Sequence, residues 1–552
     1  MFKRVLWFAL ASLAASPIAP QPASAQPAPS ADASVSVSRE VLERYVGCYE
    51  LNNTVATVGL TEDGRLTARL TGQPPGPPLR TVSANEFAVD AIGARLFFEG
   101  EGPKATRIRS QYAGSEVVGR RIADAPAAAP ASPGVCPAAA SFDAGARNDV
   151  VVNLGSALRQ RYVFPDIGEQ AAARIDAALA AGEYDSLADP AAFAARLDAD
   201  VGAIAHDKHL RINSMNAPPP PPPAGAVAMP RAEAGVVRAD KLAGGVGYIE
   251  VVGFPPPPVF KPVIDRAMSG LAGSEALIID VRRNSGGSPE SVAYLVSFLL
   301  PPDQRVHIND IVTRVPGTNE FTRQSSFSEP TPVSFAGRPV YVLTSIGTFS
   351  GGEEFAYDVK SLDRGVLIGE VTAGGANPTG PAQLGNGLIA SIPWGRAENP
   401  VTKTNWEGRG VEPDVAVDAA DALKVALERL GQDAAADIAS ASQQQVFALR
   451  AAPLPGTEAA VRSIVAGLTS GTPDYASMSP QFAEVTRQQL PQLQNLFRPL
   501  GEIKSMTYLG PGPGGGDAFD VAFANGALVV SVMLGPDGQI ISSGIRPGTP
   551  GG

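Results

Sequence analysis

The sequence predicts a multidomain α/β protein, and three features of the chain support this class. Its 552 residues exceed what one hydrophobic core usually organises, which indicates several domains. Hydrophobic residues make up 44% and charged residues 18% of the chain, as in globular proteins. Between residues 245 and 369, apolar runs alternate with helix-like segments, an order typical of parallel strands joined by helical crossovers.

The first 25 residues have the pattern of an export signal. Lys3 and Arg4 form a basic start, residues 5–15 form an apolar run, and Ala23-Ser24-Ala25 offers a cleavage site. We therefore expect a signal peptide over residues 1–25 and an exported protein, periplasmic or secreted. An anchor that spans a bilayer needs about 20 apolar residues, and no later run reaches that length, so no integral membrane segment is expected after signal removal.

The segment after the signal predicts a small β domain between two linkers. Residues 26–37 form a Pro/Ala/Ser-rich linker, and residues 38–122 contain short alternating runs such as 54–58 and 95–98. Residues 123–140 are again rich in alanine and proline, so a second linker is expected there.

Three further regions complete the predicted organisation. Residues 141–216 show the apolar spacing of helices, and residues 217–434 form the α/β core. The core region begins with a polyproline run at 218–223, which predicts a stiff spacer or a ligand for a proline-recognition module. Residues 435–552 combine helical patterning with later strand runs, which predicts an α+β accessory domain.

The charge and the cysteines limit the partners. A formal net charge of −11 is typical of a soluble protein and argues against nucleic acid, because no cluster of Lys and Arg is present. Cys48 and Cys136 are the only cysteines. They would be able to form a disulfide in an exported protein, and they would equally fit two unpaired buried side chains.

Ser350 is the first candidate catalytic residue. It lies in Gly347-Thr-Phe-Ser350-Gly-Gly-Glu-Glu354, between a buried strand at 339–344 and a helix. A hydroxyl at that point lies near backbone N–H groups and the positive end of the helix dipole, where an oxyanion is stabilised. A serine that only caps the helix is the alternative. The following Glu353 and Glu354 either face a substrate or stabilise the helix start.

A second strand ends in residues suited to the same chemistry. The segment 280–287, Asp-Val-Arg-Arg-Asn-Ser-Gly-Gly, follows the apolar run at 276–281. Its glycines can present backbone N–H groups to a developing negative charge, or they can simply form a tight turn.

Only three histidines are available as a general base. His209 lies in Asp207-Lys208-His209, while His206 is a nearby rival at a helix end and His307 lies far along the chain. His206 and His209 have no acidic or cysteine partner at a recognised metal-ligand spacing, so neither a metal nor an organic cofactor is predicted.

Together these segments resemble the serine peptidases of the C-terminal processing family, which includes tail-specific proteases, the tricorn core and the repeats of interphotoreceptor retinoid-binding protein. The resemblance covers residues 149–430, about half of the chain. Five ordered markers carry it: Asp207–Leu210, Ile279–Gly287, Thr348–Glu353, Gly369–Gly375 and Trp406–Asp414.

The resemblance implies a crotonase/ClpP-like spiral α/β core and hydrolysis of peptides or unfolded proteins through an acyl-enzyme. A neutral serine needs an imidazole to take its proton, and a carboxylate holds that imidazole in one tautomer. The implied nucleophile is Ser350, and the implied general base is His209. Glu407 is the implied orienting acid. The N–H of Gly351 and one from Gly286 or Gly287 would form the oxyanion hole.

The family has two catalytic arrangements, and the sequence resembles one of them. Tail-specific proteases place a lysine base where this chain has Gly375. The tricorn-like branch uses a histidine and a glutamate, which His209 and Glu407 match. Tricorn has a serine before its histidine, whereas this chain has Lys208, so the sequence does not give the link from Glu407 to His209.

Two other functions stay open at this point. A non-catalytic ligand-binding protein on the same core is one, and a hydrolase of small esters or amides is the other. The interval between His209 and Gly245 is too short and proline-rich for a PDZ-like domain, which weakens the case for C-terminal specificity. Cleavage preference, oligomeric state and the choice between periplasm and medium are not given by the sequence.

Overall fold

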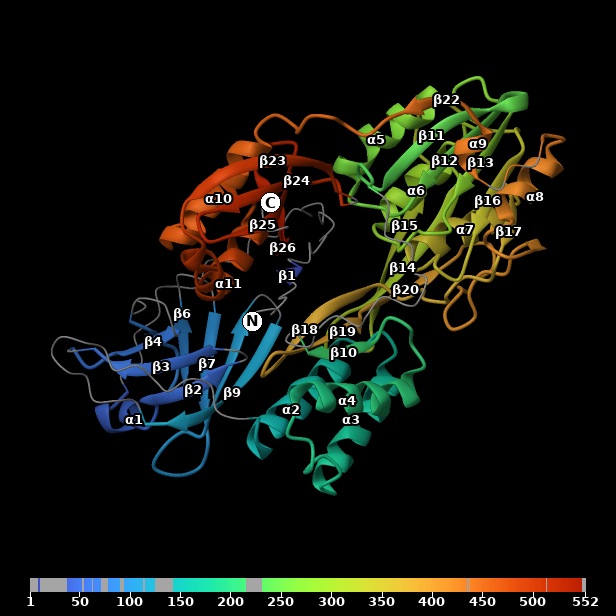
Figure 1. Ribbon diagram of the computed structural model, residues 1–552. Coiled ribbons are helices and arrows are strands. Elements are labelled where there is room, and N and C mark those ends of the chain that lie inside the picture. The colour runs from blue at the N-terminus through green and yellow to red at the C-terminus, as the bar shows by residue number, and fades with distance from the viewer. Residues whose placement is uncertain are drawn as a thin grey trace.

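The computed structural model describes residues 8–9, 37–51, 54–61, 63–70, 78–89, 94–112, 115–124, 142–214, 231–433, 435, 437–512 and 514–548. Figure 1 shows the arrangement of the chain. Most of the expected signal peptide and both linkers lie outside the described residues, as do the polyproline run and Cys136. Signal cleavage and the disulfide therefore stay predictions.

The N-terminal unit is an antiparallel β structure. After α1 (Arg39–Glu43), its eight strands follow the order β4-β3-β2-β9-β8-β7-β6-β5. Leu79 N–H, just before β5, donates to Leu66 O at the start of β4 (2.8 Å), which brings the two ends of the sheet together. Tyr45, Phe87 and Phe98 pack against one another in its core. The strands are β2 (Gly47–Leu51), β3 (Thr54–Leu60), β4 (Leu66–Leu70), β5 (Arg80–Thr81), β6 (Glu86–Val89), β7 (Ala94–Glu99), β8 (Arg107–Tyr112) and β9 (Ser115–Ala123).

The helical unit consists of α2 (Ala144–Arg161), α3 (Pro165–Ala180) and α4 (Pro190–Ala205). Asp143 and Asp189 accept backbone N–H bonds at the starts of α2 and α4, as N-cap residues do. The helices share a core with a small sheet of order β10-β19-β18, made of β10 (Arg211–Ser214), β18 (Thr379–Gly385) and β19 (Leu388–Pro393). Residues 206–210 therefore connect the last helix to a strand that pairs with the later part of the chain.

The central sheet has seven strands in the order β21-β17-β16-β13-β12-β11-β22. The pairs from β12 to β21 are parallel, so the carboxyl ends of these strands share one edge. Every residue of β12 and β13 is buried, as expected for a sheet covered on both faces. The strands are β11 (Val236–Leu242), β12 (Val246–Val251), β13 (Ala276–Asp280), β16 (Val340–Thr344), β17 (Val366–Gly369), β21 (Val415–Ala416) and β22 (Ser442–Phe447).

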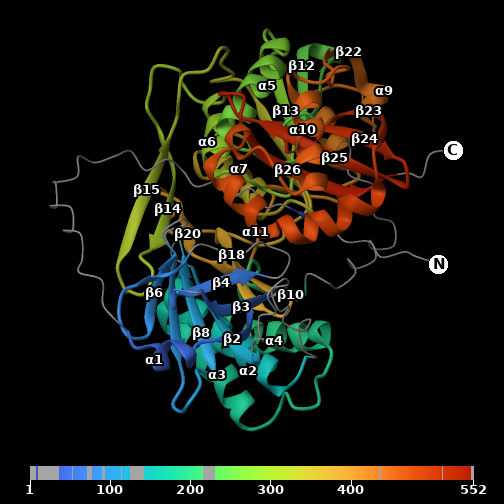
Figure 2. The same cartoon turned by 90° about the vertical axis from the view of Figure 1, so that its left-hand side faces the viewer.

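Helices and a second small sheet surround this central sheet. The helices are α5 (Pro257–Gly270), α6 (Pro289–Ser297), α7 (Gly351–Ser361), α8 (Ala422–Arg429) and α9 (Ile438–Ala441), with a short 3-10 turn at Ala243–Gly245. The small sheet, of order β15-β14-β20, is made of β14 (His307–Arg314), β15 (Phe321–Phe327) and β20 (Gly395–Glu398). Figure 2 shows β14 and β15 as a long ribbon at one side of the core.

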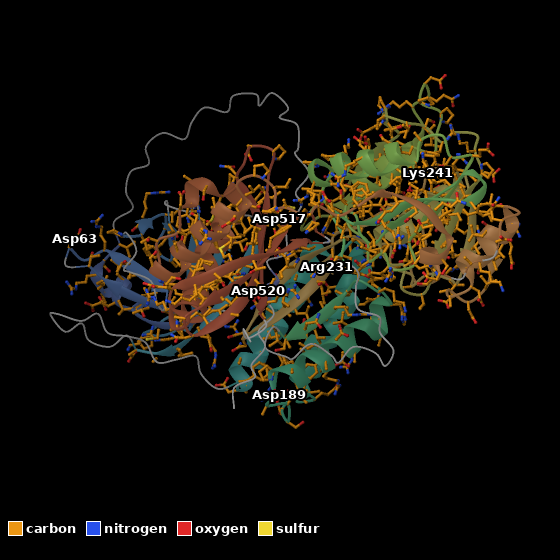
Figure 3. The ribbon with its side chains drawn as sticks, turned by 45° about the horizontal axis from the view of Figure 1, so that its top comes forward. Asp63, Asp189, Arg231, Lys241, Asp517 and Asp520 are labelled. Carbon is orange, nitrogen blue, oxygen red and sulfur yellow. The ribbon has the colours of Figure 1, made fainter. Side chains whose placement is uncertain are left out.

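The C-terminal unit packs two helices on an antiparallel sheet of order β1-β26-β25-β24-β23. Its elements are α10 (Thr457–Ser470), α11 (Pro480–Phe497), β23 (Ile503–Pro511), β24 (Asp517–Phe523), β25 (Gly526–Leu534) and β26 (Ile540–Pro547), with β1 (Phe8–Ala9) at the edge and 3-10 turns at Tyr475–Ser477 and Arg498–Leu500. Arg450 joins this unit to the core through Glu233 (2.7 Å) and Asp517 (2.9 Å), the latter labelled in Figure 3.

The prediction of a mixed α/β multidomain chain is confirmed. The exact domain limits stay predictions. Among the described residues, no helix combines the length and the apolar character that crossing a membrane requires.

Candidate active site

Ser350 stands at the turn between β16 and α7, in a backbone conformation that is rare for a residue with a side chain. Its φ is 55° and its ψ is −120°. Such a conformation costs free energy and persists only where the surrounding structure enforces it, a situation concentrated at functional sites. The Ser350 N–H donates to Glu353 Oε2 (2.9 Å), and the N–H groups of Glu353 and Glu354 donate to the Ser350 carbonyl. The helix start thus holds the serine in place.

Glu353 connects the serine turn to the loop that follows β17 through hydrogen bonds to its carboxylate. It is fully buried, and burial is the largest cause of its raised pKa. Besides Ser350, three groups donate to its carboxylate: the hydroxyl of Thr372 (2.5 Å), the N–H of Gly374 (2.5 Å) and the N–H of Gly375 (2.8 Å). Its neighbour Glu354 is also buried and accepts from Asn309 Nδ2 (2.9 Å). Both acids thus lie inside the fold, away from the surface.

The glycine turn after β13 packs closely against Ser350. Gly286 has a φ of 101°, and a Cβ on it would stand 2.6 Å from Ser350 Cβ. Its N–H already donates to Asn284 Oδ1 (2.9 Å), which leaves it unsuited to a second acceptor. Gly287 is exposed, and its N lies 3.0 Å from where a Cβ on Gly351 would stand. Within the described part of the chain, the N–H groups of Gly287 and Gly351 have no acceptor.

His209 lies between α4 and β10, with its ring on the residue that precedes the serine. The rings of His209 and Phe349 are stacked, with centroids 4.5 Å apart and planes inclined by 28°. A Cβ on Gly375 would stand 2.7 Å from His209 Cε1 and would also collide with Phe349. Because any side chain at 375 would enter this space, the ring of His209 and a lysine at position 375 exclude one another here.

The surroundings of His209 favour a neutral imidazole. Burial lowers the pKa of His209, the charge of Arg211 lowers it further, and the charge of Asp207 opposes both. A neutral ring has a nitrogen lone pair that can accept a proton at neutral pH. The Nδ1 atom is buried and makes no hydrogen bond to any described residue.

Two carboxylates lie beside the histidine. Glu407 Oε1 accepts from Lys208 N–H (2.9 Å), and its Oε2 accepts from Ala376 N–H (2.5 Å). Burial, followed by the charge of Asp207, raises the pKa of Glu407 to about 7. The link from Glu407 to the histidine segment therefore runs through the backbone of residue 208, and the Lys208 side chain takes no part in it.

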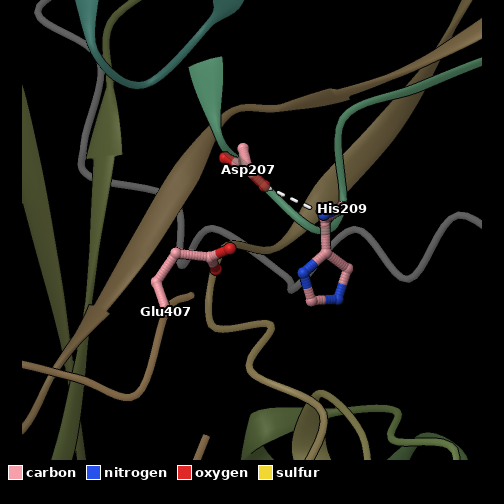
Figure 4. A group of neighbouring side chains, drawn as sticks. All are labelled: Asp207, His209 and Glu407. Atoms are coloured by element: carbon pink, nitrogen blue, oxygen red, sulfur yellow. Dashed lines mark hydrogen bonds between the residues drawn. The ribbon is translucent and has the colours of Figure 1, made fainter. Parts of the chain in front are cut away.

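Asp207 is the other carboxylate, and sequence reasoning gave it no role. Its Oδ1 accepts from His209 N–H (2.9 Å), and its Oδ2 accepts from Tyr162 Oη–H (3.1 Å) and Asn377 Nδ2–H (2.9 Å). Figure 4 shows Asp207, His209 and Glu407 side by side. One ligand atom from each of the three lies within 4.8 Å of the other two.

The structure thus brings together several of the candidates and separates others from them. Gly286 and Gly351 lie against each other at Ser350, while His209 lies on Phe349 beside Glu407. The rival His206 is exposed and ends α4 in a left-handed conformation, and His307 pairs with Asp310 (2.7 Å) on β14. The sequence signal for Asp207 was its place two residues before the histidine, but only the fold gives it partners.

Comparison with known proteins identifies the region that holds this site. Residues 245–417 match the model of peptidase family S41, and residues 145–236 match that of the N-terminal domain of Peptidase_S41 in eukaryotic IRBP. These two matched ranges contain Ser350, His209 and Glu407.

Solved structures that resemble this chain have low sequence identity to it. A protein of Parabacteroides merdae described as a candidate peptidase is 19% identical, with 54% of this chain and 94% of that chain covered and a TM-score of 0.40. The photosystem II D1 C-terminal processing protease is 16% identical, with 52% and 98% covered and a TM-score of 0.37. The tricorn protease is 15% identical, with 70% and 45% covered and a TM-score of 0.33.

The family likeness rests on the two sequence models. Residues 145–236 and 245–417 match the models of peptidase family S41, and this match supports a serine-type peptidase.

Proposed function

We propose that this protein is an exported peptidase that hydrolyses peptide bonds through an acyl-enzyme on Ser350, with His209 as the general base. One observation carries the proposal. A strained, partly exposed serine at a helix start adjoins two open N–H groups, and the residue before it stacks on a partly buried histidine whose surroundings favour the neutral ring. This combination supplies a nucleophile, a base and an oxyanion hole within one small region.

In the proposed reaction, His209 takes the Ser350 hydroxyl proton while Oγ attacks the carbonyl carbon of the peptide. The tetrahedral oxyanion accepts hydrogen bonds from the N–H groups of Gly351 and Gly287. Gly286 has a purely structural role, because its N–H donates to Asn284 Oδ1. The imidazolium then protonates the leaving amine. In the second half, His209 takes a proton from water, which attacks the acyl carbon. His209 then returns this proton to Ser350 Oγ as the ester bond breaks, and both residues regain their starting state.

Glu407 is the proposed orienting acid. It holds the histidine segment through the Lys208 amide, and its negative charge stabilises the imidazolium that forms when the serine is deprotonated. The substrates proposed are peptides or unfolded proteins, bound on a crotonase/ClpP-like spiral core over residues 217–434.

Labelling with a fluorophosphonate probe tests the nucleophile and the base together. We expect the wild-type protein to label, and we expect Ser350→Ala and His209→Ala to lose the label while remaining folded. The controls are Ser269→Ala, an exposed serine on α5, and His307→Ala, a histidine that also has a carboxylate partner. Both controls should label like wild type.

The other outcomes discriminate between the alternatives. A folded wild-type protein that does not label favours the non-catalytic ligand-binding protein. Labelling with turnover of small esters but of no peptide favours the ester or amide hydrolase. Labelling that survives in Ser350→Ala contradicts the nucleophile assignment.

A further inference from the structure

Asp207, His209 and Glu407 form a cluster with the composition and spacing of a metal site. One nitrogen or oxygen atom of each lies within 4.8 Å of the others, and Figure 4 shows the three side chains around a common space. The three residues come from two distant parts of the chain. Lys208 and Glu407, which are hydrogen-bonded, are 199 positions apart. The cluster was therefore invisible as a ligand spacing in the sequence.

The cluster lacks a hydrogen-bond partner for its imidazole and a cation for its carboxylates in the described chain. The Nδ1 atom of His209 is buried and has no hydrogen-bond partner in the described chain. The hydrogen bonds that Asp207 and Glu407 accept from described residues come from neutral groups, namely backbone N–H groups, the Tyr162 hydroxyl and the Asn377 amide. A buried imidazole nitrogen without a partner, next to two carboxylates without a cation, is the electrostatic environment that a bound divalent ion would satisfy.

The carboxylates are also held in advance by a second layer of donors. Tyr162 and Asn377 donate to Asp207, and backbone N–H groups donate to both oxygens of Glu407. Asp207 Oδ1 and both oxygens of Glu407 each accept one of these bonds and keep a further lone pair for an ion, whereas Asp207 Oδ2 accepts two. Partners of this kind orient metal ligands, and their removal typically weakens metal binding about 10–100-fold.

The donor set of one imidazole nitrogen and two carboxylate oxygens suits Zn²⁺. Zinc takes such ligands at about 2.0–2.2 Å in a tetrahedral arrangement, with water able to fill the fourth position. Ligand atoms around a tetrahedral zinc lie about 3.4 Å apart by that geometry. The ligand atoms of the cluster lie within 4.8 Å of one another, so the site would close on a zinc ion by rotation of these side chains.

We propose that Zn²⁺ binds to Asp207, His209 and Glu407 and reversibly switches the peptidase off. Coordination of the imidazole and of Glu407 takes the base and its orienting acid out of use, so Ser350 keeps its proton. Binding of the metal stands by itself, whereas inhibition rests on the proposed function. The two parts therefore need separate measurements.

Metal binding is measured on the full, tag-free chain carrying Ser350→Ala, which removes the nucleophile and leaves the three ligands. We expect one Zn²⁺ per chain in competition with a chromophoric chelator, and a visible absorption band of tetrahedral type with Co²⁺. His209→Ala and Glu407→Gln should each weaken binding by about 100-fold or more, and Asp207→Asn by about 10-fold or more. His307→Ala should bind like the parent.

Inhibition is measured on the wild-type chain by fluorophosphonate labelling. Zn²⁺ should reduce the label in proportion to occupancy, EDTA should restore it, and Mg²⁺ at the same concentration should have no effect. Absence of stoichiometric zinc binding overturns the proposal, and so does binding that survives in folded His209→Ala. Zinc that binds without reducing the label overturns the inhibitory role. A wild-type chain that never labels refutes the proposed function, while the binding measurement still decides the metal site.

Discussion

The backbone of Ser350 is in a strained conformation that glycine would adopt without a free-energy cost. Its positive φ with ψ near −120° lies outside the regions open to residues with a Cβ, and the bonds of Glu353 hold it there. The structure thus gives up some stability at the residue proposed to attack the substrate, as active sites often do.

The first prediction compares two inactive variants of this residue. Ser350→Gly should be more stable than Ser350→Ala by about 1–3 kcal/mol, because glycine adopts this conformation without strain. Urea unfolding of the two proteins measures the difference. Equal stabilities would show that the backbone at 350 is not strained.

Gly375 provides a second prediction at the residue scale. Gly375→Ala should lower kcat/KM by about 100-fold or more, because the added Cβ displaces the His209 ring or Phe349. Gly202→Ala, on α4, is the matched control, since nothing lies within 4 Å of its added Cβ. Peptide turnover by both proteins is the measurement, and a fully active Gly375→Ala would contradict the tight placement of the histidine.

At the scale of elements, α7 joins the serine turn to a group of buried acids. Glu354 accepts from Asn309, and Asp358 accepts from Asn399 Nδ2 (3.1 Å). Burial raises the pKa of Glu354 to about 7 and raises the pKa of Asp358, to which the charge of Glu354 also contributes. The helix therefore prefers these carboxyl groups protonated.

This preference predicts how stability changes with pH. The pKa of Glu354 in the folded state lies above its ordinary value of 4.5, so its contribution is complete below pH 4.5 and is lost as pH rises through about 7. Glu354→Gln should therefore be more stable than wild type at pH 8 by about 1–3 kcal/mol, with a smaller gain at pH 5. Urea unfolding at both pH values tests this. A gain that does not grow with pH would argue against a raised pKa.

The parts of the site that sequence could predict are those made by single elements. The strand, glycine turn and helix around Ser350 are signals within a few residues, and so is the strand that ends at Asp280. The roles of Glu353 and Asp207 were not predictable, because each depends on a loop far away in the sequence. In the sequence, Glu353 fits an acid that stabilises a helix start by its charge. Its hydrogen bonds to the loop after β17 become visible only in the folded chain.

At the scale of the whole molecule, buried charges connect the core to the C-terminal unit. Arg450 lies between Glu233, three residues before β11, and Asp517, at the start of β24. Both acids are buried, and Arg266 is a second partner of Glu233. The separate β, helical, α/β and α+β regions could be anticipated from composition, whereas this connection needs three residues from distant segments.

Removal of Arg450 should loosen that connection. Arg450→Met leaves Asp517 buried without its cation, so we expect a loss of about 3–5 kcal/mol and faster proteolysis around residues 448–457. Arg462→Met, which removes an exposed partner of Glu458, should behave like wild type. Limited proteolysis and thermal unfolding compare the two. Equal resistance of both variants would mean that the pair does not hold the unit.

The hydrogen bond from Lys208 to Glu407 is donated by the backbone N–H, which every amino acid except proline provides. The Lys208 side chain is exposed and contributes nothing to that bond. In a saturation library at position 208, selected for peptide turnover, nineteen of the residues should therefore survive at similar frequencies, and proline, which has no N–H, should disappear. The position would look freely variable in any sample of functional sequences while still being indispensable to the site.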